Sequence, residues 1–250
     1  MPAVLETRRL CKSFGALTVA DNVNFRLEPG ARHALIGPNG AGKTTFVNML
    51  TGVLAPTSGG VFLNDEEITS KNQAARVKGG LGRTFQITTL FRSLPVLDNV
   101  ALAVAERSGI ARRMWRAASS YQDIIGESRE LLDNLGLADV AAARAQDLPY
   151  GKQRLVEIAI ALGLKPRVLL LDEPAAGVPS ADSERFLNIL EKLPAEIAIL
   201  IIEHDMDLVF KFAQRITVLV QGQVLVEGTP TEIARDQRVR DVYLGEATHA

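Results

Sequence analysis

The sequence contains very little cysteine and no marked excess of basic residues. Its 250 residues include one cysteine, Cys11, and the formal net charge is −1. A single cysteine excludes an intrachain disulfide, which is typical of proteins in a reducing compartment. The near-neutral charge lacks the basic footprint that nucleic-acid-binding proteins carry. We therefore expect no nucleic-acid partner.

Long apolar runs are also missing. Even the longest apolar runs, such as residues 197–202, are short. A membrane-spanning helix needs about 20 apolar residues. The first 15 residues contain no apolar segment of signal-peptide length. The composition, 47% hydrophobic and 23% charged, is typical of a globular protein with a substantial core. We expect a soluble chain, whose role at a membrane would come through a partner.

The pattern of apolar residues divides the chain into a core and an insert. Residues 168–172 and 198–202 are nearly unbroken apolar runs, typical of parallel strands buried on both faces. Alternation around residues 23–27 predicts an antiparallel β subdomain, whereas helical spacing prevails from 89 to 162. The sequence predicts an α/β core, residues 1–88 and 163–250, interrupted by an all-helical subdomain, residues 89–162.

A glycine-rich motif, GPNGAGKTT, lies between an expected strand and an expected helix. Its glycines let backbone N–H groups surround phosphates, and the helix N-terminus adds positive potential. Lys43 can reach the β- and γ-phosphates, and the Thr44 hydroxyl can ligate Mg²⁺. We predict an ATP and Mg²⁺ site formed by Gly37, Pro38, Asn39, Gly40, Ala41, Gly42, Lys43, Thr44 and Thr45.

Two acidic residues follow the first buried apolar run, in VLLLDEP. Ligands bind outside the carboxyl ends of strands in open α/β sheets, which is where Asp172 and Glu173 are expected. Asp172 can hold Mg²⁺, and Glu173 can orient and deprotonate a water that attacks the γ-phosphate. The alternative, a pair of surface acids, is less consistent with the phosphate-binding motif upstream.

Together these motifs resemble those of the ATP-binding subunits of ABC transporters. The order GPNGAGKTT, GRTFQ, LPYGKQ, VLLLDEP and IIEHD covers nearly the whole chain. The resemblance implies one ATPase domain over residues 1–250, with a P-loop NTPase (RecA-like) core, an antiparallel β subdomain and a helical subdomain that contacts membrane subunits. It also implies that two subunits pair head to tail, each ATP lying between one phosphate loop and the partner's signature, here Tyr150, Gly151, Lys152 and Gln153.

The resemblance implies roles for three further residues. Phe14 would stack on adenine, Gln86 would sense Mg²⁺ and the attacking water, and His204 would contact the γ-phosphate. The expected catalytic residues are therefore Glu173, Gln86 and His204. The expected metal ligands are Thr44, Asp172 and Gln86. The alternatives are that Phe14 packs the hairpin and that Gln86 is a polar junction residue. His33 and His249 are interpreted as structural or solvated, and arginine-rich residues 106–120 as a solvated helix face rather than a lipid-contacting segment.

The sequence departs from the family's pattern at three positions. Pro149 replaces the usual serine of the signature, so a hydroxyl and an N–H are lost there. Tyr150 replaces a common glycine. Pro179 replaces the aspartate that usually ends the loop after Glu173 and links the two sites. These changes leave Gly151 and the following amides to contact the partner's phosphate.

The carboxyl-terminal segment, with VYLGE, resembles that of bacterial importers for branched-chain amino acids. This implies a homo- or heterodimer of ATP-binding subunits on the cytoplasmic face of the plasma membrane. The dimer would bind permease subunits, to which a solute-binding protein delivers the solute. Related importers for urea, amides or aromatic acids are the alternative. A non-transport ABC ATPase and an unrelated phosphate-loop kinase are the remaining hypotheses, and neither explains LPYGKQ together with the branch-like tail.

Overall fold

The computed structural model describes residues 2–84, 90–109, 118–177 and 180–247. Its strands are β1 (Leu5–Phe14), β2 (Leu17–Leu27), β3 (Arg32–Ile36), β4 (Ser58–Leu63), β5 (Glu66–Glu67), β6 (Leu81–Arg83), β7 (Val168–Asp172), β8 (Ala198–Ile202), β9 (Arg215–Val220) and β10 (Gln223–Gly228). Its α-helices are α1 (Lys43–Thr51), α2 (Gln73–Lys78), α3 (Val96–Arg107), α4 (Ala118–Asn134), α5 (Tyr150–Gly163), α6 (Ser180–Glu191), α7 (Met206–Phe212), α8 (Pro230–Arg235) and α9 (Gln237–Ala247), and two 3-10 turns are η2 (Ala138–Val140) and η3 (Ala145–Asp147).

The chain forms two compact units. The first comprises Met1–Leu81, Arg167–Glu173 and Leu193–Ala250, and the second comprises Gly82–Pro166 and Pro174–Lys192. The sequence-based boundaries of the helical subdomain, 89 and 162, lie inside the second unit. That unit also includes the segment with α6, because the chain returns to it after Glu173.

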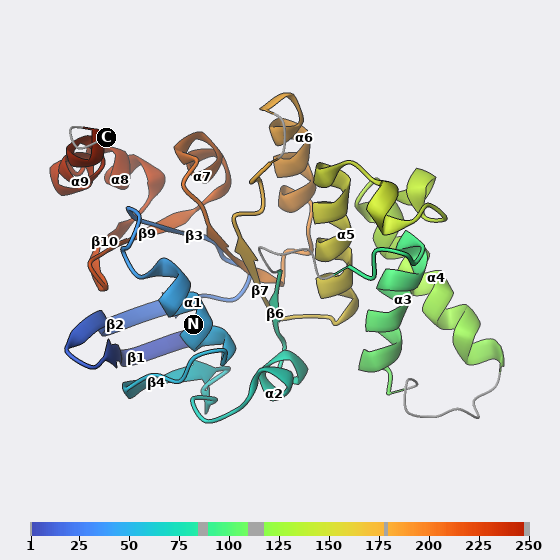
Figure 1. The fold of residues 1–250 in the computed structure, drawn as a ribbon, viewed down its shortest axis with the longest axis horizontal. Helices are drawn as coiled ribbons and strands as arrows, with labels where there is room; N and C mark the ends of the chain where they lie inside the picture. The colour runs from blue at the N-terminus through green and yellow to red at the C-terminus, as the bar shows by residue number, and fades with distance from the viewer. Residues whose placement is uncertain (1, 85–89, 110–117, 178–179, 248–250) are drawn as a thin grey trace. The chain divides into compact units, whose positions relative to one another are not determined.

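Two sheets build the first unit (Figure 1). An antiparallel sheet has the order β2-β1-β4-β5, and a larger sheet has the order β10-β9-β3-β8-β7-β6. In the larger sheet β9, β3, β8 and β7 run parallel, and β10 joins β9 as an antiparallel hairpin. Every residue of β7 and β8 is buried, which confirms the expectation from their unbroken apolar runs.

Helix α1 packs into the core that both sheets share. Phe46 and Leu50 of α1 lie in one buried cluster with Phe25 of the antiparallel sheet and with Leu35 and Leu200 of the larger sheet. The rings of Phe25 and Phe46 meet edge to face, with their centroids 5.6 Å apart. The α/β core with an antiparallel β subdomain, predicted from the sequence, is therefore confirmed.

A buried arginine holds the C-terminal end of α1. The Arg76 guanidinium donates hydrogen bonds to the carbonyls of Met49 and Leu50 at 2.7 and 2.6 Å, and to those of Thr69 and Lys71 at 2.8 and 2.9 Å. The bonds to Met49 and Leu50 supply a donor to carbonyls of the last turn of α1, and the positive charge suits the negative end of the helix dipole. Burial lowers the pKa of Arg76 from its ordinary value, but an arginine remains charged.

Helices dominate the second unit. Helix α3 packs against both α4 and α5, as Figure 1 also shows. The helical spacing noted between residues 89 and 162 is explained in α4 by burial of Ile124 and Leu132, and Leu135 is buried just after the helix. Arg107 of α3 forms an ion pair with Glu127 of α4 at 2.6 Å. The other basic residues of the segment 106–120 fall at 112, 113 and 116, outside the described residues. Across the part of the chain that the structure describes, no helix is long and apolar enough to cross a membrane.

Candidate functional site

Three parallel strands bring the predicted catalytic segments to one edge of the larger sheet. Leu35 of β3 pairs with Ile202 of β8, and Ile202 pairs with Asp172 of β7. Since neighbouring strands lie about 4.8 Å apart, the ends of all three fall in one row. The phosphate loop follows β3, Glu173 follows β7 and His204 follows β8. The residues that the sequence placed in separate motifs therefore share the carboxyl edge of this sheet.

The glycines of the phosphate loop differ in what surrounds them. A Cβ at Gly37 would lie 2.1 Å from the Leu219 carbonyl oxygen, and one at Gly42 would lie 2.7 Å from that of Val19. Gly40 has a φ of +76° and no heavy atom within 4 Å of a Cβ position. The first two glycines are thus required by close packing, whereas the backbone at Gly40 faces open space. That open cradle fits a phosphate group bound to backbone N–H donors.

The start of α1 supplies the charged and hydroxyl groups of the cradle. Gly42 precedes the helix with a φ of 98° and offers no side chain to cap it. The first-turn N–H groups of α1 are therefore available to an anion. The Lys43 ammonium donates to the carbonyl of Pro38 at 2.9 Å and to that of Gly37, so it lies over the loop. Thr44 is exposed.

The donor set suits Mg²⁺ held partly by a nucleotide. Asp172 is 3% exposed at the end of β7, and Thr44 is the second residue of α1. Among the described residues, no group of three or more His, Cys, Asp or Glu side chains could hold a metal ion. Mg²⁺ commonly uses one or two protein oxygens together with phosphates and waters, so a single carboxylate and a hydroxyl fit that mode.

Glu173 and His204 occupy neighbouring turns beyond the strand ends. Glu173 has a φ of 45°, in the left-handed region that side chains other than glycine rarely adopt. Such a conformation turns the chain sharply out of the sheet edge. The His204 imidazole is 70% exposed, with its Nδ1 3.8 Å from the buried Glu203 carboxylate. His204 is therefore exposed at this edge, and Glu173 is half-buried.

Phe14 ends β1 with half of its surface exposed. Its exposed fraction is 50%, and the Lys12 ammonium lies 5.0 Å from the ring centroid. The alternative in which Phe14 packs the hairpin leaves this exposure unexplained, because a packing phenylalanine would be buried. An exposed aromatic ring remains suited to stacking on a base.

The signature segment lies in the second unit, at the start of α5. Pro149 is the N-cap residue, and its side chain caps no N–H group. Lys152 forms an ion pair with Asp139 at 2.8 Å, and the Gln153 side chain donates to the Leu148 carbonyl at 2.8 Å. Gly151 is part-buried. The first-turn N–H groups of α5 therefore receive no cap from the side chain of the N-cap residue. Gln86 and Pro179 lie outside the described residues.

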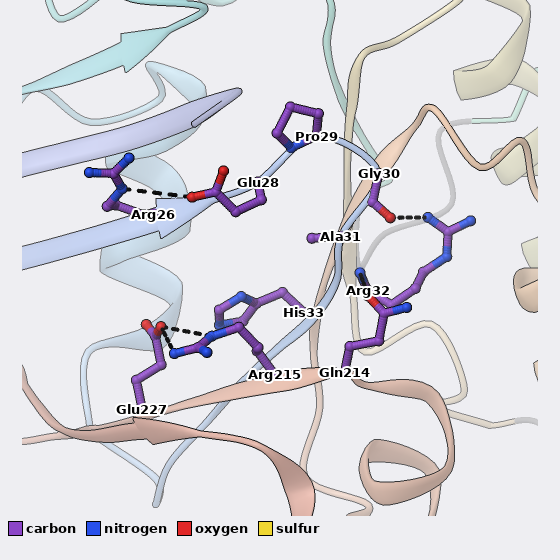
Figure 2. Close-up of a pocket in the computed structure, with 10 residues that line it drawn as sticks. All are labelled: Arg26, Glu28, Pro29, Gly30, Ala31, Arg32, His33, Gln214, Arg215 and Glu227. Atoms are coloured by element: carbon purple, nitrogen blue, oxygen red, sulfur yellow. Dashed lines mark hydrogen bonds and ion pairs between the residues drawn. The ribbon is translucent and has the colours of Figure 1, made fainter. Parts of the chain in front are cut away.

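A separate pocket of about 470 Å³ lies at the amino ends of β3 and β9, shown in Figure 2. Arg215 forms an ion pair with Glu227 at 2.8 Å, and Nε2 of His33 lies 2.8 Å from Thr217 Oγ1. Burial lowers the pKa of His33 to about 4. The interpretation of His33 as structural is confirmed, whereas His249 lies outside the described residues. This pocket is at the opposite end of β3 from the phosphate loop.

Sequence reasoning missed two features that support the site. Arg76 holds the C-terminal end of the helix that the phosphate loop begins. Tyr150 lies so close to Gly177 that a Cβ there would be 2.8 Å from its ring. The first had no sequence signal, because the partners of Arg76 are backbone carbonyls, two of them in α1. The second could have been suspected from the unusual tyrosine at a position where glycine is common.

The fold and the site define a nucleotide-binding protein of the P-loop class. Comparison with known proteins then narrows the class. The family model described as "ABC transporter" matches residues 20–176, and that of the "Branched-chain amino acid ATP-binding cassette transporter" matches residues 223–249. The chain belongs to the ABC transporter family, as an ATP-binding subunit with ATPase function, which confirms the sequence-based prediction.

Relatives agree along the whole chain. The high-affinity branched-chain amino acid transport ATP-binding protein LivG of Escherichia coli (strain K12) is 37% identical, and BraF of Pseudomonas aeruginosa is 36% identical, each alignment covering 98% of both chains. The ADP conformation of MJ1267, an ATP-binding cassette of an ABC transporter, is 29% identical with a TM-score of 0.84, over 98% of this chain and 100% of that one. The carboxyl-terminal resemblance noted in the sequence is therefore confirmed.

Proposed function

We propose that the chain binds and hydrolyses MgATP at the interface of a head-to-tail pair of ATP-binding subunits, and so drives uptake of branched-chain amino acids through permease subunits. The row formed by Leu35, Ile202 and Asp172 carries this proposal. It brings phosphate loop, acidic pair and histidine to one edge of the sheet. An enzyme that transfers a phosphoryl group to water needs a phosphate cradle, a metal ligand and a group that orients the water at one point.

Each residue of the proposed site has a defined task in this reaction. The loop amides and Lys43 bind the β- and γ-phosphates, and Thr44 and Asp172 hold Mg²⁺, which neutralises charge on the phosphates when bound. Glu173 orients a water and accepts its proton as the water attacks the γ-phosphorus. His204 binds the γ-phosphate, and Phe14 stacks on the adenine ring. Gln86 completes the metal and water contacts by its resemblance to the family's glutamine.

The second unit supplies the partner's half of the site. The N-terminus of α5 presents the amides of Tyr150, Gly151 and Lys152 without a side-chain cap. A γ-phosphate is the anion that such a helix end stabilises. A relative with 25% identity and a TM-score of 0.77 is described as the dimeric structure of MJ0796, a bacterial ABC transporter cassette, which supports pairing of this kind. The pair is formed by two copies or by this chain and a related subunit.

The transported solute follows from the relatives rather than from the site. LivG and BraF are named as branched-chain amino acid transport proteins, and the tail match at residues 223–249 belongs to the same branch. Importers for urea, amides or aromatic acids are the alternative solute classes. In either case the chain acts at the cytoplasmic face of the plasma membrane, held there by permease subunits that receive solute from a binding protein.

The ATPase proposal is tested by separating dimer formation from hydrolysis. Glu173→Gln removes the proton acceptor but keeps the side chain's length, so ATP should trap a dimer that size-exclusion chromatography detects. Hydrolysis should fall by about 100-fold or more, since general base catalysis contributes on that order. Glu130→Gln, at an exposed carboxylate of α4, is the matched control. A Glu173→Gln protein that hydrolyses ATP normally, or never dimerises with ATP, contradicts the proposed mechanism.

The solute is tested in the assembled importer. The chain is reconstituted in liposomes with its permease subunits, its paired ATP-binding subunit and its solute-binding protein. We expect leucine, isoleucine or valine to stimulate ATP hydrolysis and to accumulate in the vesicles. Stimulation by urea, an amide or an aromatic acid instead would reassign the solute and leave the ATPase proposal intact.

A further inference from the structure

The Tyr150 ring contacts the backbone of Gly177. A Cβ added at Gly177 would lie 2.8 Å from Cε1 and 3.0 Å from Cδ1 of Tyr150. Gly177 also has a φ of +75°, which favours glycine on its own. Two independent requirements therefore select glycine at this position, and one of them is the tyrosine ring. Both residues belong to the second unit, and Gly177 is four residues after Glu173 in the sequence.

A buried charge pair on the same helix face holds the tyrosine. The Arg154 guanidinium carbon lies 5.0 Å from the Tyr150 ring centroid, within range of a cation–π contact. Arg154 is itself bonded to Glu157 at 2.8 Å, and both side chains are almost fully buried. Residues 150, 154 and 157 are spaced so that they share one face of α5. The ring is therefore fixed from its own helix, although Tyr150 is 40% exposed.

We infer that Tyr150 is a positioning residue that attaches the turn after Glu173 to the start of α5. The inference rests on the proposed function, in which α5 faces the partner's nucleotide and Glu173 faces the chain's own. Through this contact, a shift of the α5 N-terminus on binding the partner's phosphate moves the turn at Gly177, and with it the chain that leads back to Glu173. Pro179 stands where the family has a linking aspartate. The tyrosine contact supplies an intrachain link between the two half-sites.

The link predicts a particular kinetic signature. Tyr150→Leu removes the ring but leaves no core cavity, since the side chain is partly exposed. We expect kcat for ATP hydrolysis by the full-length protein to fall about tenfold, with KM for ATP within about twofold, because the chain's own phosphate loop is unchanged. Tyr150→Phe keeps the ring and should recover most of the lost kcat. Direct contact of the hydroxyl with phosphate predicts the opposite, an equal loss in both variants, and would overturn the inference.

A second variant tests the contact from the other side. Gly177→Ala brings a Cβ against the ring at a positive φ, and it should lower kcat to a similar extent. Gly109→Ala is the matched control, because Gly109 has a φ of +68° and no heavy atom within 4 Å of a Cβ position. Gly109→Ala introduces the same backbone strain without a clash against a ring. Its kcat should equal that of the unaltered protein.

The double variant decides the outcome. If the two residues act through one contact, Tyr150→Leu/Gly177→Ala loses no more kcat than either single variant. The inference is overturned if the losses of kcat in the two single variants multiply in the double variant. It is also overturned if Gly177→Ala loses no more kcat than Gly109→Ala. If the unaltered protein hydrolyses no ATP, the proposed function fails instead. Melting temperatures identify any variant that has lost its fold. If Gly177→Ala is one of them, the comparison of kcat between Tyr150→Leu and Tyr150→Phe tests the inference.

Discussion

The backbone N–H of Glu173 donates a 2.9 Å hydrogen bond to the carbonyl of Ile202, across the ends of β7 and β8. The bond fixes the first residue beyond β7 while its φ is held at 45°. A left-handed conformation at a residue with a long side chain costs of order 1–2 kcal/mol, which the surrounding structure must offset. The strain is therefore stored at the residue that the proposed mechanism uses as its base.

Replacing Glu173 with asparagine should relieve this strain. Asparagine tolerates positive φ better than glutamate does, so Glu173→Asn is expected to raise the free energy of unfolding by about 0.5–1 kcal/mol while abolishing hydrolysis. Glu173→Gln, which keeps the strain, is the control and should leave stability unchanged. Urea unfolding measures stability, and phosphate release measures hydrolysis. Equal stabilities of the two variants would show that no strain is stored there.

Arg76 is expected to be the most important polar side chain for the stability of the first unit. Arg76→Ala removes bonds to four backbone carbonyls, of which those of Met49 and Leu50 lie in buried bonds at the end of α1. We expect a loss of about 3 kcal/mol or more, measured by urea unfolding. Arg76→Lys should lose nearly as much, because one ammonium cannot reach all four acceptors. Arg8→Ala, which removes an exposed ion pair with Glu6 and a cation–π contact with Phe62, should cost much less than Arg76→Ala. A small loss in Arg76→Ala would mean that water replaces the guanidinium.

His33 should make stability fall in mild acid. Thr217 Oγ1 donates to the Glu227 carboxylate and so accepts a hydrogen bond from Nε2–H of His33. Burial lowers the pKa of His33 to about 4; the Glu227 charge raises it and the Arg215 charge lowers it. An unfolded histidine has a pKa near 6.5, so between pH 6.5 and 4 the unfolded chain binds more protons. The free energy of unfolding therefore decreases as the pH falls through this window, by up to about 3 kcal/mol.

The contribution of His33 is measured by comparison with a variant that does not titrate. His33→Gln keeps a donor for Thr217 and removes the ionisation. We expect its free energy of unfolding to depend less steeply on pH between 4 and 6.5, after both proteins are unfolded in urea at each pH. Carboxylate titration affects both proteins alike and cancels in the difference. Parallel curves would show that His33 gains no extra proton on unfolding.

Local patterns predicted which segments meet at the carboxyl ends of the parallel strands. The spacing of Gly37, Lys43 and Asp172 is a property of the sequence, and the unbroken apolar runs identified β7 and β8 as buried parallel strands. Parallel strands place their carboxyl ends at one edge, so the site followed from the strand assignment. The structure added the order of the strands, which set the row of Leu35, Ile202 and Asp172.

Other features depend on contacts that sequence spacing does not report. Arg76 reaches carbonyls as many as 27 residues away, and any arginine in a short helix would look the same in the sequence. The grouping of α6 with the helical unit depends on the chain returning to it after Glu173. The close approach of Tyr150 to Gly177 gives no sequence signal of its own, because a glycine in a sequence more often indicates a turn. These are tertiary constraints, and they appear only when the chain is folded.

The last prediction concerns Pro149, which precedes α5 without capping it. Pro149→Ser adds a side-chain hydroxyl that can accept from the first-turn amides, and helix caps of this kind are worth about 1 kcal/mol. The same hydroxyl could donate to the partner's phosphate, but the helix amides and dipole already provide the larger part of that interaction. We therefore expect ATPase activity within about tenfold of the unaltered protein, together with a small gain in stability. Gly151→Asp should abolish hydrolysis, because it places negative charge and bulk where the phosphate binds. An active Gly151→Asp dimer would mean that α5 does not face nucleotide.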